Sequence, residues 1–274
     1  MSMTHSLTLG LAQLTPKVGH IDANLASLGQ TLKAHPEVDL MVLPELFLGG
    51  YTTRDPAAGA VTPEDVRIHE LSELARRHDT ALILGAAEHY AGGIANSALC
   101  LDRRGQLLGS YRKAQLFGDE STVFTAGDAL TVIEFDGVRI GLMICFDLEF
   151  PEVARALARE GADLLVTISA NMTPFGQDHH VFARARAIEN GLPHVYVNQV
   201  GAGEVFTFTG GSMVVSPDGQ IDAAAGDNGE AVTVAHLELP FISTLRPRYL
   251  ELLRDPPPTV RTAGRDGKAS SPTE

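Results

Sequence analysis

The sequence has few cysteines and no long hydrophobic run, although it extends over 274 residues. Its two cysteines, Cys100 and Cys145, could form one bridge at most, which excludes a small scaffold held together by several disulfides. The longest apolar runs are well short of the roughly 20 residues that cross a bilayer. The first residues also lack the basic start and long apolar stretch of a signal peptide. From these absences we expect a cytoplasmic protein.

Basic residues are outnumbered, because 21 Lys and Arg stand against 34 Asp and Glu and give a formal net charge of −13. An acidic surface repels phosphate backbones and anionic lipids, so we expect neither nucleic acid nor a membrane as a partner. Hydrophobic residues make up 44% of the chain and charged residues 20%. This composition is typical of a globular protein with a sizeable core and excludes a disordered chain.

Several common functional patterns are also missing. The sequence has no C-x-x-C, H-E-x-x-H or G-x-S-x-G motif and no P-loop, and Gly201-Ala202-Gly203 falls short of a dinucleotide-binding fingerprint. His179 and His180 are adjacent in a predicted helix, without the spacing of metal ligands, and such histidines are more often structural. We therefore expect neither a metal nor a cofactor.

Short strand-like runs alternate with helical patterns along most of the chain. The predicted strands cover 7–14, 40–43, 81–88, 94–101, 107–111, 130–135, 138–144, 164–169, 194–200, 211–215 and 231–237, and the predicted helices cover 21–32, 63–78, 151–160 and 178–190. This alternation predicts an α/β protein with helices covering its sheets.

No linker divides the chain before Asp255, where three consecutive prolines open a polar segment. We therefore predict one domain over residues 1–254, followed by a polar, Pro-rich C-terminal tail over residues 255–274. The tail is expected either to pack on a partner subunit or to be disordered.

Three residues with reactive side chains lie where predicted strands end. Cys145 follows the strand 138–144 and precedes a helix predicted to begin at Pro151, which favours the thiolate. Glu45 and Lys113 each lie just beyond another strand, and the carboxyl ends of strands are where open α/β sheets bind ligands. Each could instead be structural: an inert core cysteine, a helix cap or an edge charge. Their combination favours a catalytic site.

The segments around these residues resemble the signature blocks of the nitrilase superfamily of carbon–nitrogen hydrolases, in the order of that family. The blocks are LPE at 43–45, YRKAQLF at 111–117 and GLMICFDLEFPE at 141–152, with further matches in RAIEN at 186–190, VNQVG at 197–201 and GGSM at 210–213. The resemblance covers about residues 7–253, and Gln115 departs from it where many relatives carry His. It implies a single-domain, four-layer α-β-β-α sandwich that forms a homodimer or a larger homo-oligomer.

The resemblance also implies roles for individual residues. Cys145 would be the nucleophile, Glu45 the general base and Lys113 the cation that stabilises the oxyanion. Glu120 resembles the second glutamate of the family, which orients the lysine and the substrate. The substrate-binding residues would be Phe146, through its backbone N–H, with Glu149, Asn171, Met172 and Tyr51.

The substrate expected from this resemblance is a small amide. The chain resembles the amidase branch, and Phe117-Gly118 and the segment 170–174 resemble 5-aminopentanamidases and R-stereoselective amidases. Relatives that bind carboxylates carry Arg at the position of Glu149, so a carboxylate here would favour an ammonium group. Glu149 could instead brace a loop or Lys113.

We therefore expect an amidase that hydrolyses an ω-amino amide such as 5-aminopentanamide to the acid and ammonia through a thioester. The alternatives are hydrolysis of an N-carbamoyl amine or of another, R-selective amide, and a non-catalytic binding protein on the same fold.

Overall fold

The computed structural model of the chain describes residues 5–239 and 249–252. The tail predicted over 255–274 lies outside the described residues, as does the predicted boundary at residue 254, so this division of the chain stays a prediction. Within the described ranges, no helix is both long enough and apolar enough to cross a membrane.

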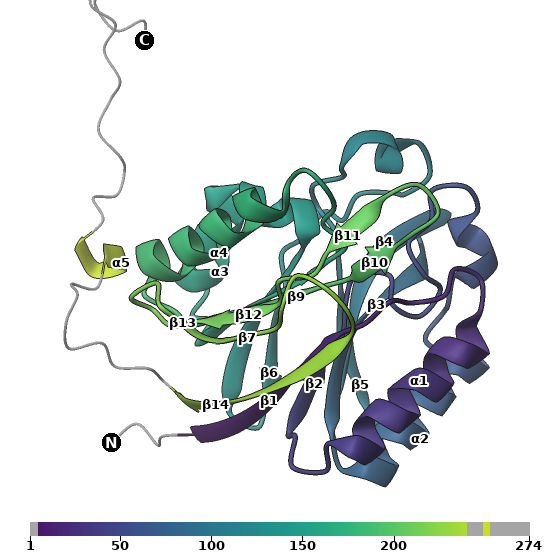
Figure 1. The fold of residues 1–274 in the computed structure, drawn as a ribbon, viewed down its shortest axis with the longest axis horizontal. Helices are drawn as coiled ribbons and strands as arrows, with labels where there is room; N and C mark the ends of the chain where they lie inside the picture. The colour runs from purple at the N-terminus through teal and green to yellow at the C-terminus, as the bar shows by residue number, and fades with distance from the viewer. Residues whose placement is uncertain (1–4, 240–248, 253–274) are drawn as a thin grey trace, which may run out of the picture.

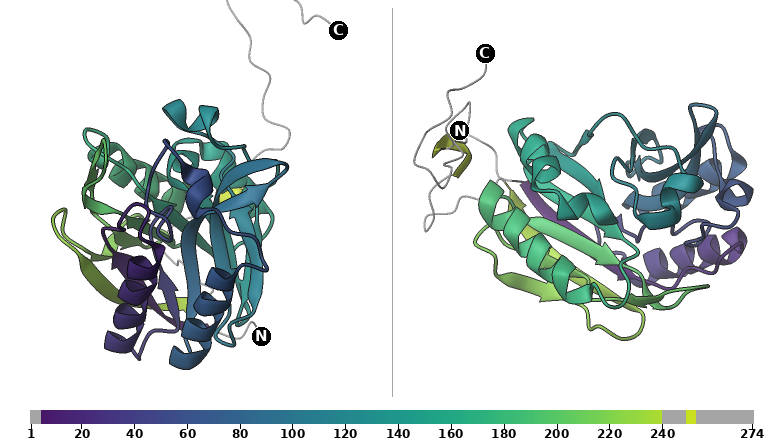
Figure 2. Two further views of the ribbon diagram at one scale, coloured as in Figure 1. Left: turned by 90° about the vertical axis from the view of Figure 1, so that its right-hand side faces the viewer. Right: turned by 90° about the horizontal axis from the view of Figure 1, so that it is seen from above.

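Two six-stranded sheets pack face to face, and each carries two helices on its outer surface (Figures 1 and 2). The first sheet has the order β14 (Ala231–Leu239), β1 (His5–Gln13), β2 (Leu40–Val42), β3 (Ala81–Tyr90), β4 (Gly93–Leu101), β5 (Leu107–Arg112). The second has the order β13 (Ile221–Ala224), β12 (Met213–Val215), β9 (His194–Asn198), β8 (Leu164–Ser169), β7 (Val138–Ile144), β6 (Val132–Phe135). This is the predicted four-layer α-β-β-α sandwich.

The remaining elements cover the sheets or connect their strands. The helices are α1 (Ile21–Ala34), α2 (Val66–His78), α3 (Pro151–Arg159), α4 (Gly176–Asn190) and α5 (Tyr249–Leu252); the short 3-10 helices are η1 (Pro56–Gly59), η2 (Gly118–Thr122) and η3 (Cys145–Glu149); a separate hairpin joins β10 (Val200–Ala202) to β11 (Thr207–Thr209).

The two sheets share one pattern of strand directions. In each sheet three neighbouring strands are parallel, namely β1, β2 and β3 in one and β7, β8 and β9 in the other. Antiparallel strands flank each trio on both sides. The three parallel strands of each trio end at the same edge of their sheet. The loops that follow them can therefore carry functional residues at this carboxyl edge.

Both faces of each sheet are buried, as expected for sheets that lie between layers. Leu7, Leu9 and Leu11 of β1 pack in the core between the sheets, where they belong to one cluster with Leu142 and Ile144 of β7. The outer face of the first sheet packs against the apolar stripes of α1 and α2. The helices α3 and α4 cover the second sheet in the same way.

Some element boundaries differ from the sequence predictions for identifiable reasons. The helix predicted from residue 63 begins at Val66, because the Asp65 side chain caps it by accepting a hydrogen bond from the Arg67 N–H. The strand predicted over 194–200 is interrupted at Gln199, so it gives β9 and the start of β10. The strand predicted over 211–215 begins only at Met213, since Gly211 has a positive φ of 71°. Strands β11 and β13 were not predicted.

Candidate active site

Glu45, Lys113 and Cys145, which are far apart in the sequence, come together beyond the ends of β2, β5 and β7. The Lys113 ammonium lies 2.7 Å from Glu45 Oε1, and Lys113 and Cys145 line one small cavity. The other predicted residues line the same cavity: Glu120, Phe146, Glu149, Asn171, Met172 and Tyr51. The structure therefore brings the predicted site residues together, with Glu45 placed behind Lys113.

The backbone turns sharply at Cys145, which begins η3 directly after β7. Cys145 has a φ of +46°, a left-handed conformation that is uncommon for a side chain other than glycine. The buried Asp147 side chain stabilises this turn by accepting hydrogen bonds from Ile144 N–H, Gln115 N–H and Tyr111 O–H, at 2.9, 2.9 and 2.8 Å. The thiol is thereby held at a rigid corner of the cavity.

The Cys145 thiol differs from the sequence expectation in one respect. Its position after a strand and before a helix was expected to favour the thiolate, but burial raises the pKa of Cys145 and the Glu45 charge adds to this rise. The charge of Lys113 and the Ser169 side chain act in the opposite direction without overcoming burial. The resting sulfur is therefore a thiol, so its proton must be removed during an attack.

The Glu45 carboxylate is buried and fully hydrogen-bonded. Its Oε1 accepts from Lys113 Nζ and Asn96 Nδ2, both at 2.7 Å, and its Oε2 accepts from the Ala170 N–H at 2.7 Å. The Gln199 side chain donates to the Glu45 backbone carbonyl at 2.7 Å. These contacts fix the position of the carboxylate. They also offset the free-energy cost of burying its charge, which is high for an unpaired carboxylate.

Lys113 lies between two carboxylates. Its ammonium is 2.7 Å from Glu45 and 2.8 Å from Glu120, and all three side chains are buried. Glu120 also accepts hydrogen bonds from Tyr51 O–H at 3.0 Å and from Phe117 N–H at 2.8 Å. Glu120 therefore has the position of a residue that orients the lysine.

The pKa values of this buried trio follow from burial and charge together. Burial raises the pKa of Glu45, and Lys113 opposes the rise. Burial alone would lower the pKa of Lys113, but the charges of Glu45 and Glu120 outweigh it, so the net direction is upward. Lys113 is thus held as a cation next to the thiol at neutral pH.

The cavity also has aromatic side chains and a second carboxylate, Glu149, in its wall. Phe117 makes edge-to-face contacts with Phe146 and Phe175, at centroid distances of 5.3 and 6.1 Å. Glu149 Oε1 lies 3.4 Å from His179 Nε2, and the Glu149 side chain is 31% exposed. Glu149 thus contacts both the cavity and His179, and within the described part of the chain the ion pairs of Lys113 are with Glu45 and Glu120, not with Glu149.

The cavity is narrow. The volume available to the centre of a water molecule is about 10 Å³, and about 10–15 Å³ is what one water needs. Phe175, which is 38% exposed, is the most exposed of the aromatic side chains in its wall.

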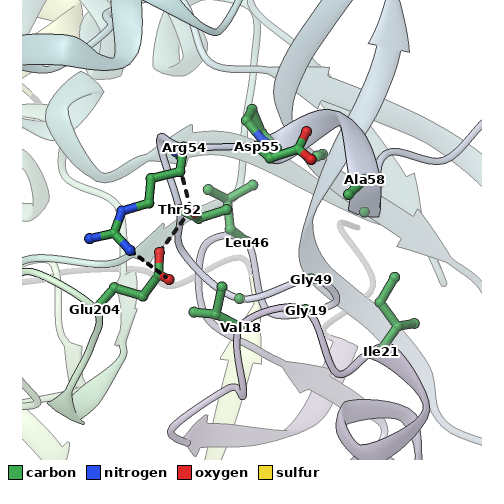
Figure 3. A pocket seen from close by; sticks show the side chains of 14 residues that line it. Val18, Gly19, Ile21, Leu46, Gly49, Thr52, Arg54, Asp55, Ala58 and Glu204 are labelled. Carbon is green, nitrogen blue, oxygen red and sulfur yellow. Dashed lines mark hydrogen bonds and ion pairs between the residues drawn. The ribbon is translucent and has the colours of Figure 1, made fainter.

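A larger cavity of about 260 Å³ contains none of the predicted site residues (Figure 3). Its wall is mostly apolar and includes Leu46, the neighbour of Glu45 in the chain. The Glu204 side chain accepts a hydrogen bond from Thr52 at 2.9 Å and lies 3.6 Å from Arg54 (Figure 3). This cavity is lined by neither a cysteine nor a lysine, so the combination of a thiol and an ammonium group is found at the small cavity that Cys145 and Lys113 line.

Sequence reasoning missed several polar residues that shape the site. Asn96 and Gln199 hydrogen-bond to Glu45, and the Ser169 side chain lowers the pKa of Cys145. Asn96 lies within β4 and Ser169 is the last residue of β8, and a polar residue in or at the end of a mostly apolar strand is the feature of the sequence that could have drawn attention to them. His179 was expected to be structural, yet it lines the cavity.

The chain matches the family model described as carbon–nitrogen hydrolase over residues 8–247. It is 36% identical over 252 residues to an (R)-stereoselective amidase from a Pseudomonas species, with 91% of each chain covered.

Among solved structures, the chain resembles an amidase from Nesterenkonia sp. AN1 at 29% identity. One structure shows the acetamide moiety of fluoroacetamide covalently added at its active-site cysteine, and it has a TM-score of 0.81, covering 90% of this chain and 94% of that chain. Another shows a variant of the same amidase in complex with butyramide, with a TM-score of 0.81 and the same coverage.

Proposed function

Because the chain belongs to the carbon–nitrogen hydrolase family, we propose that it is an amidase that hydrolyses a small aliphatic primary amide to the acid and ammonia. The observation that carries this proposal is the buried contact of Lys113 with Glu45 and Glu120 beside the Cys145 thiol. A cation and a thiol that line one cavity, with the carboxylate of Glu45 in contact with the cation, supply the groups that acyl transfer from an amide requires.

In the first half of the reaction, Glu45 removes the proton of the Cys145 thiol as the sulfur attacks the amide carbon. The carbonyl oxygen becomes an oxyanion, which Lys113 and the backbone N–H of Phe146 stabilise. Losing one such donor typically costs about 3–4 kcal/mol of barrier. Glu45 then gives its proton to the amide nitrogen, the C–N bond breaks, and ammonia leaves behind a thioester on Cys145.

In the second half, a water molecule enters the place of ammonia. Glu45 accepts a proton from this water while the water oxygen attacks the thioester carbon. Lys113 and the Phe146 N–H again stabilise the oxyanion of the new intermediate. Collapse of the intermediate breaks the C–S bond and returns the proton to sulfur, which releases the carboxylic acid. Glu120 keeps Lys113 in position throughout.

The preferred substrate in this proposal is an ω-amino amide such as 5-aminopentanamide. Glu149 is an acidic side chain in the cavity wall, and because it is 31% exposed its carboxylate is accessible to a substrate ammonium. A five-carbon chain needs more space than the closed cavity has, so this substrate binds only when the Phe175 side of the wall opens.

A short neutral amide is the second candidate. The aromatic wall and the small cavity favour an uncharged chain of few carbons, and the Nesterenkonia amidase was solved with butyramide. Hydrolysis of an N-carbamoyl amine is a third possibility within the family, and it differs by releasing carbon dioxide beside ammonia.

The catalytic part of the proposal is tested by replacing the nucleophile. We expect Cys145→Ala to abolish ammonia release from every amide and Cys145→Ser nearly to abolish it, because a serine hydroxyl is a weaker nucleophile at this site. Full turnover by Cys145→Ala would refute the thioester mechanism.

The substrate part is tested with pairs of amides that differ only in the terminal group, such as 5-aminopentanamide and pentanamide. Glu149→Gln keeps the size of the side chain and removes its charge. If Glu149 binds the ammonium group, this variant raises KM for the amino amide about tenfold and leaves KM for pentanamide within twofold of the wild-type value. Equal effects on both amides would assign the site to neutral substrates.

A further inference from the structure

Two consecutive buried amides, Asn198 and Gln199, stand at the end of β9 and take no part in the amide mechanism. Asn198 is the last residue of the strand, and the exposed fractions of the two residues are 0% and 1%. Burying a primary amide costs free energy unless its N–H and C=O groups are hydrogen-bonded. The partners of these side chains therefore indicate what each of them holds in place.

The Asn198 side chain binds the backbone of Asn171, in the loop that follows β8. Its Oδ1 accepts from the Asn171 N–H at 2.7 Å, and its Nδ2 donates to the Asn171 carbonyl at 3.2 Å. Nδ2 also lies 2.9 Å from the Gly210 carbonyl and 3.2 Å from Thr209 Oγ1. Because an N–H needs an acceptor and a carbonyl needs a donor, these partners fix the orientation of the amide. Asn198 thus holds both backbone polar groups of Asn171.

The Gln199 side chain extends from the second sheet to the first. Its Nε2 donates to the Glu45 backbone carbonyl at 2.7 Å, although the two residues are 154 positions apart. The Gln199 main chain is itself fixed, because its N–H donates to the Ser169 carbonyl at 3.0 Å and its carbonyl accepts from the Gly210 N–H at 2.9 Å. Gln199 therefore joins the loop after β2, which carries Glu45, to the end of β9.

The two loops that these amides hold meet in one hydrogen bond. Ala170 directly precedes Asn171, and its backbone N–H donates to Glu45 Oε2 at 2.7 Å. The direction of this N–H depends on the path of the loop after β8, and the position of the carboxylate depends on the loop after β2. Asn198 thus acts on the donor side of this hydrogen bond and Gln199 on its acceptor side.

We propose that Asn198 and Gln199 are positioning residues for the base, which together keep the Ala170 N–H directed at the Glu45 carboxylate. A hydrogen bond donated to a carboxylate favours its charged form, and this is the form of Glu45 that can accept the thiol proton. The role rests on the proposed function, because it presumes that Glu45 is the base.

The proposal predicts a change in the pH dependence of catalysis. Glu45 must be deprotonated to act as the base, so kcat/KM falls as the pH drops through the pKa of the carboxyl group in the free enzyme. Weakening the Ala170 hydrogen bond disfavours the carboxylate and moves this acidic limb to higher pH. A variant that is merely less stable would lower the rate without moving the midpoint of the limb.

The first measurement is the pH profile of kcat/KM for pentanamide, which carries no charge of its own. It compares the wild type with Asn198→Ala and with Gln199→Met, in which a thioether replaces the amide donor. We expect the midpoint of the acidic limb to rise by about half a pH unit or more in each variant. In Asn198→Ala the Asn171 N–H can still donate to Ser169 Oγ, which lies 3.1 Å from it in the wild type, so we expect the loop to shift rather than to unfold.

Hydrogen–deuterium exchange measures the positioning directly and needs no turnover. Peptides that contain residues 170–172 should exchange about tenfold faster in Asn198→Ala than in the wild type, because the loop loses the side chain that holds it. Peptides from β7 should exchange at the wild-type rate. An equal increase in all peptides would mean that the variant is less stable as a whole, and it would contradict the proposal.

The matched control is Asn190→Ala, at the last residue of α4. Asn190 is also a buried asparagine, and its Nδ2 donates to the Arg186 carbonyl within the same helix at 2.9 Å. The variant therefore removes a buried amide whose partner lies in α4. Its Tm should fall, but its acidic limb and the exchange of residues 170–172 should match those of the wild type.

Three results would overturn the proposal: an acidic limb that stays in place in either variant, an equal shift in Asn190→Ala, or unchanged exchange of residues 170–172 in Asn198→Ala. A failure of the proposed function is distinguishable, because it appears as turnover by Cys145→Ala. The exchange measurement decides whether Asn198 holds the loop in either case.

Discussion

At the scale of single residues, the site buries more negatively charged side chains than positively charged ones. Glu45 and Glu120 contribute two carboxylates and Lys113 one ammonium, and all are buried together. A thiolate at Cys145 would add a further negative charge in a low-dielectric environment, where like charges repel strongly. This explains why burial and Glu45 raise the pKa of Cys145, and why transfer of its proton has to accompany attack.

The role of Glu45 as base can be tested by an isosteric change. Glu45→Gln keeps a side chain that can accept from the Ala170 N–H but cannot take a proton. Because general base catalysis typically contributes about 10²–10⁴-fold, we expect kcat for ammonia release to fall by about that factor. Circular dichroism should show that the variant is folded.

Asn96→Ala is a useful comparison for this variant. It removes one hydrogen bond to Glu45 Oε1 but leaves the carboxylate and Lys113 in place, so its loss in kcat should be much smaller. A Glu45→Gln variant that kept more than a tenth of the wild-type kcat would contradict the assignment of Glu45 as base.

At the scale of elements, the loop after β2 is held against β3 by close backbone contact. Gly85 N–H donates to the Pro44 carbonyl and the Gly85 carbonyl accepts from Leu48 N–H, both at 3.0 Å. A Cβ atom at Gly85 would lie 2.1 Å from the Leu46 nitrogen and 2.6 Å from Glu45 Cα. The absence of a side chain at Gly85 therefore determines where Glu45 lies.

Gly85→Ala should consequently displace Glu45 without touching any reactive group. Backbone atoms cannot move aside as a flexible side chain can, so we expect at least a 100-fold loss of kcat/KM and a lower Tm. Gly226→Ala is the control, because a Cβ there meets nothing within 4 Å, and it should keep its activity and Tm. Normal activity in Gly85→Ala would show that the loop tolerates displacement.

At the scale of the whole molecule, the helix layer over the second sheet depends on a buried neutral histidine. His194 Nδ1 lies 3.1 Å from the Ala183 carbonyl of α4, and its Nε2 lies 2.8 Å from Thr167 Oγ1 of β8. Burial lowers the pKa of His194 to about 4. Between these two pKa values, His194 therefore binds a proton in the unfolded chain, where its pKa is near 6.5, but stays neutral in the folded protein.

This difference predicts how stability depends on pH. The contribution of His194 is fully present above about pH 6.5 and is lost as the pH falls towards 4. Between pH 7.5 and pH 5 it should lower the free energy of unfolding by about 2 kcal/mol. Urea unfolding at both pH values, for the wild type and for His194→Gln, measures it.

The variant is expected to be less stable than the wild type at pH 7.5, but its free energy of unfolding should fall about 2 kcal/mol less on acidification. Parallel losses in the two proteins would mean that other groups account for the acid sensitivity. Homo-oligomerisation, which stays a prediction, is checked by light scattering under both conditions so that the comparison refers to one state.

The sequence by itself determined the type of fold and the family, and it drew attention to the residues that we propose as reactive. Alternating strand and helix patterns predicted the α/β class, and the segments around Glu45, Lys113 and Cys145 identified the family, because both depend on residues that are close together in the chain. The resemblance also supplied the α-β-β-α arrangement and the position of Glu120.

Only the tertiary structure decided the protonation and surroundings of those residues. The thiol state of Cys145 follows from burial and from Glu45, and the contacts of Asn96, Gln199 and Ser169 join strands that are distant in sequence. The contact of Tyr196 with His179 likewise exists only where β9 and α4 pack together. Burial and directed hydrogen bonds are properties of packed neighbours, and a local pattern of residues does not contain them.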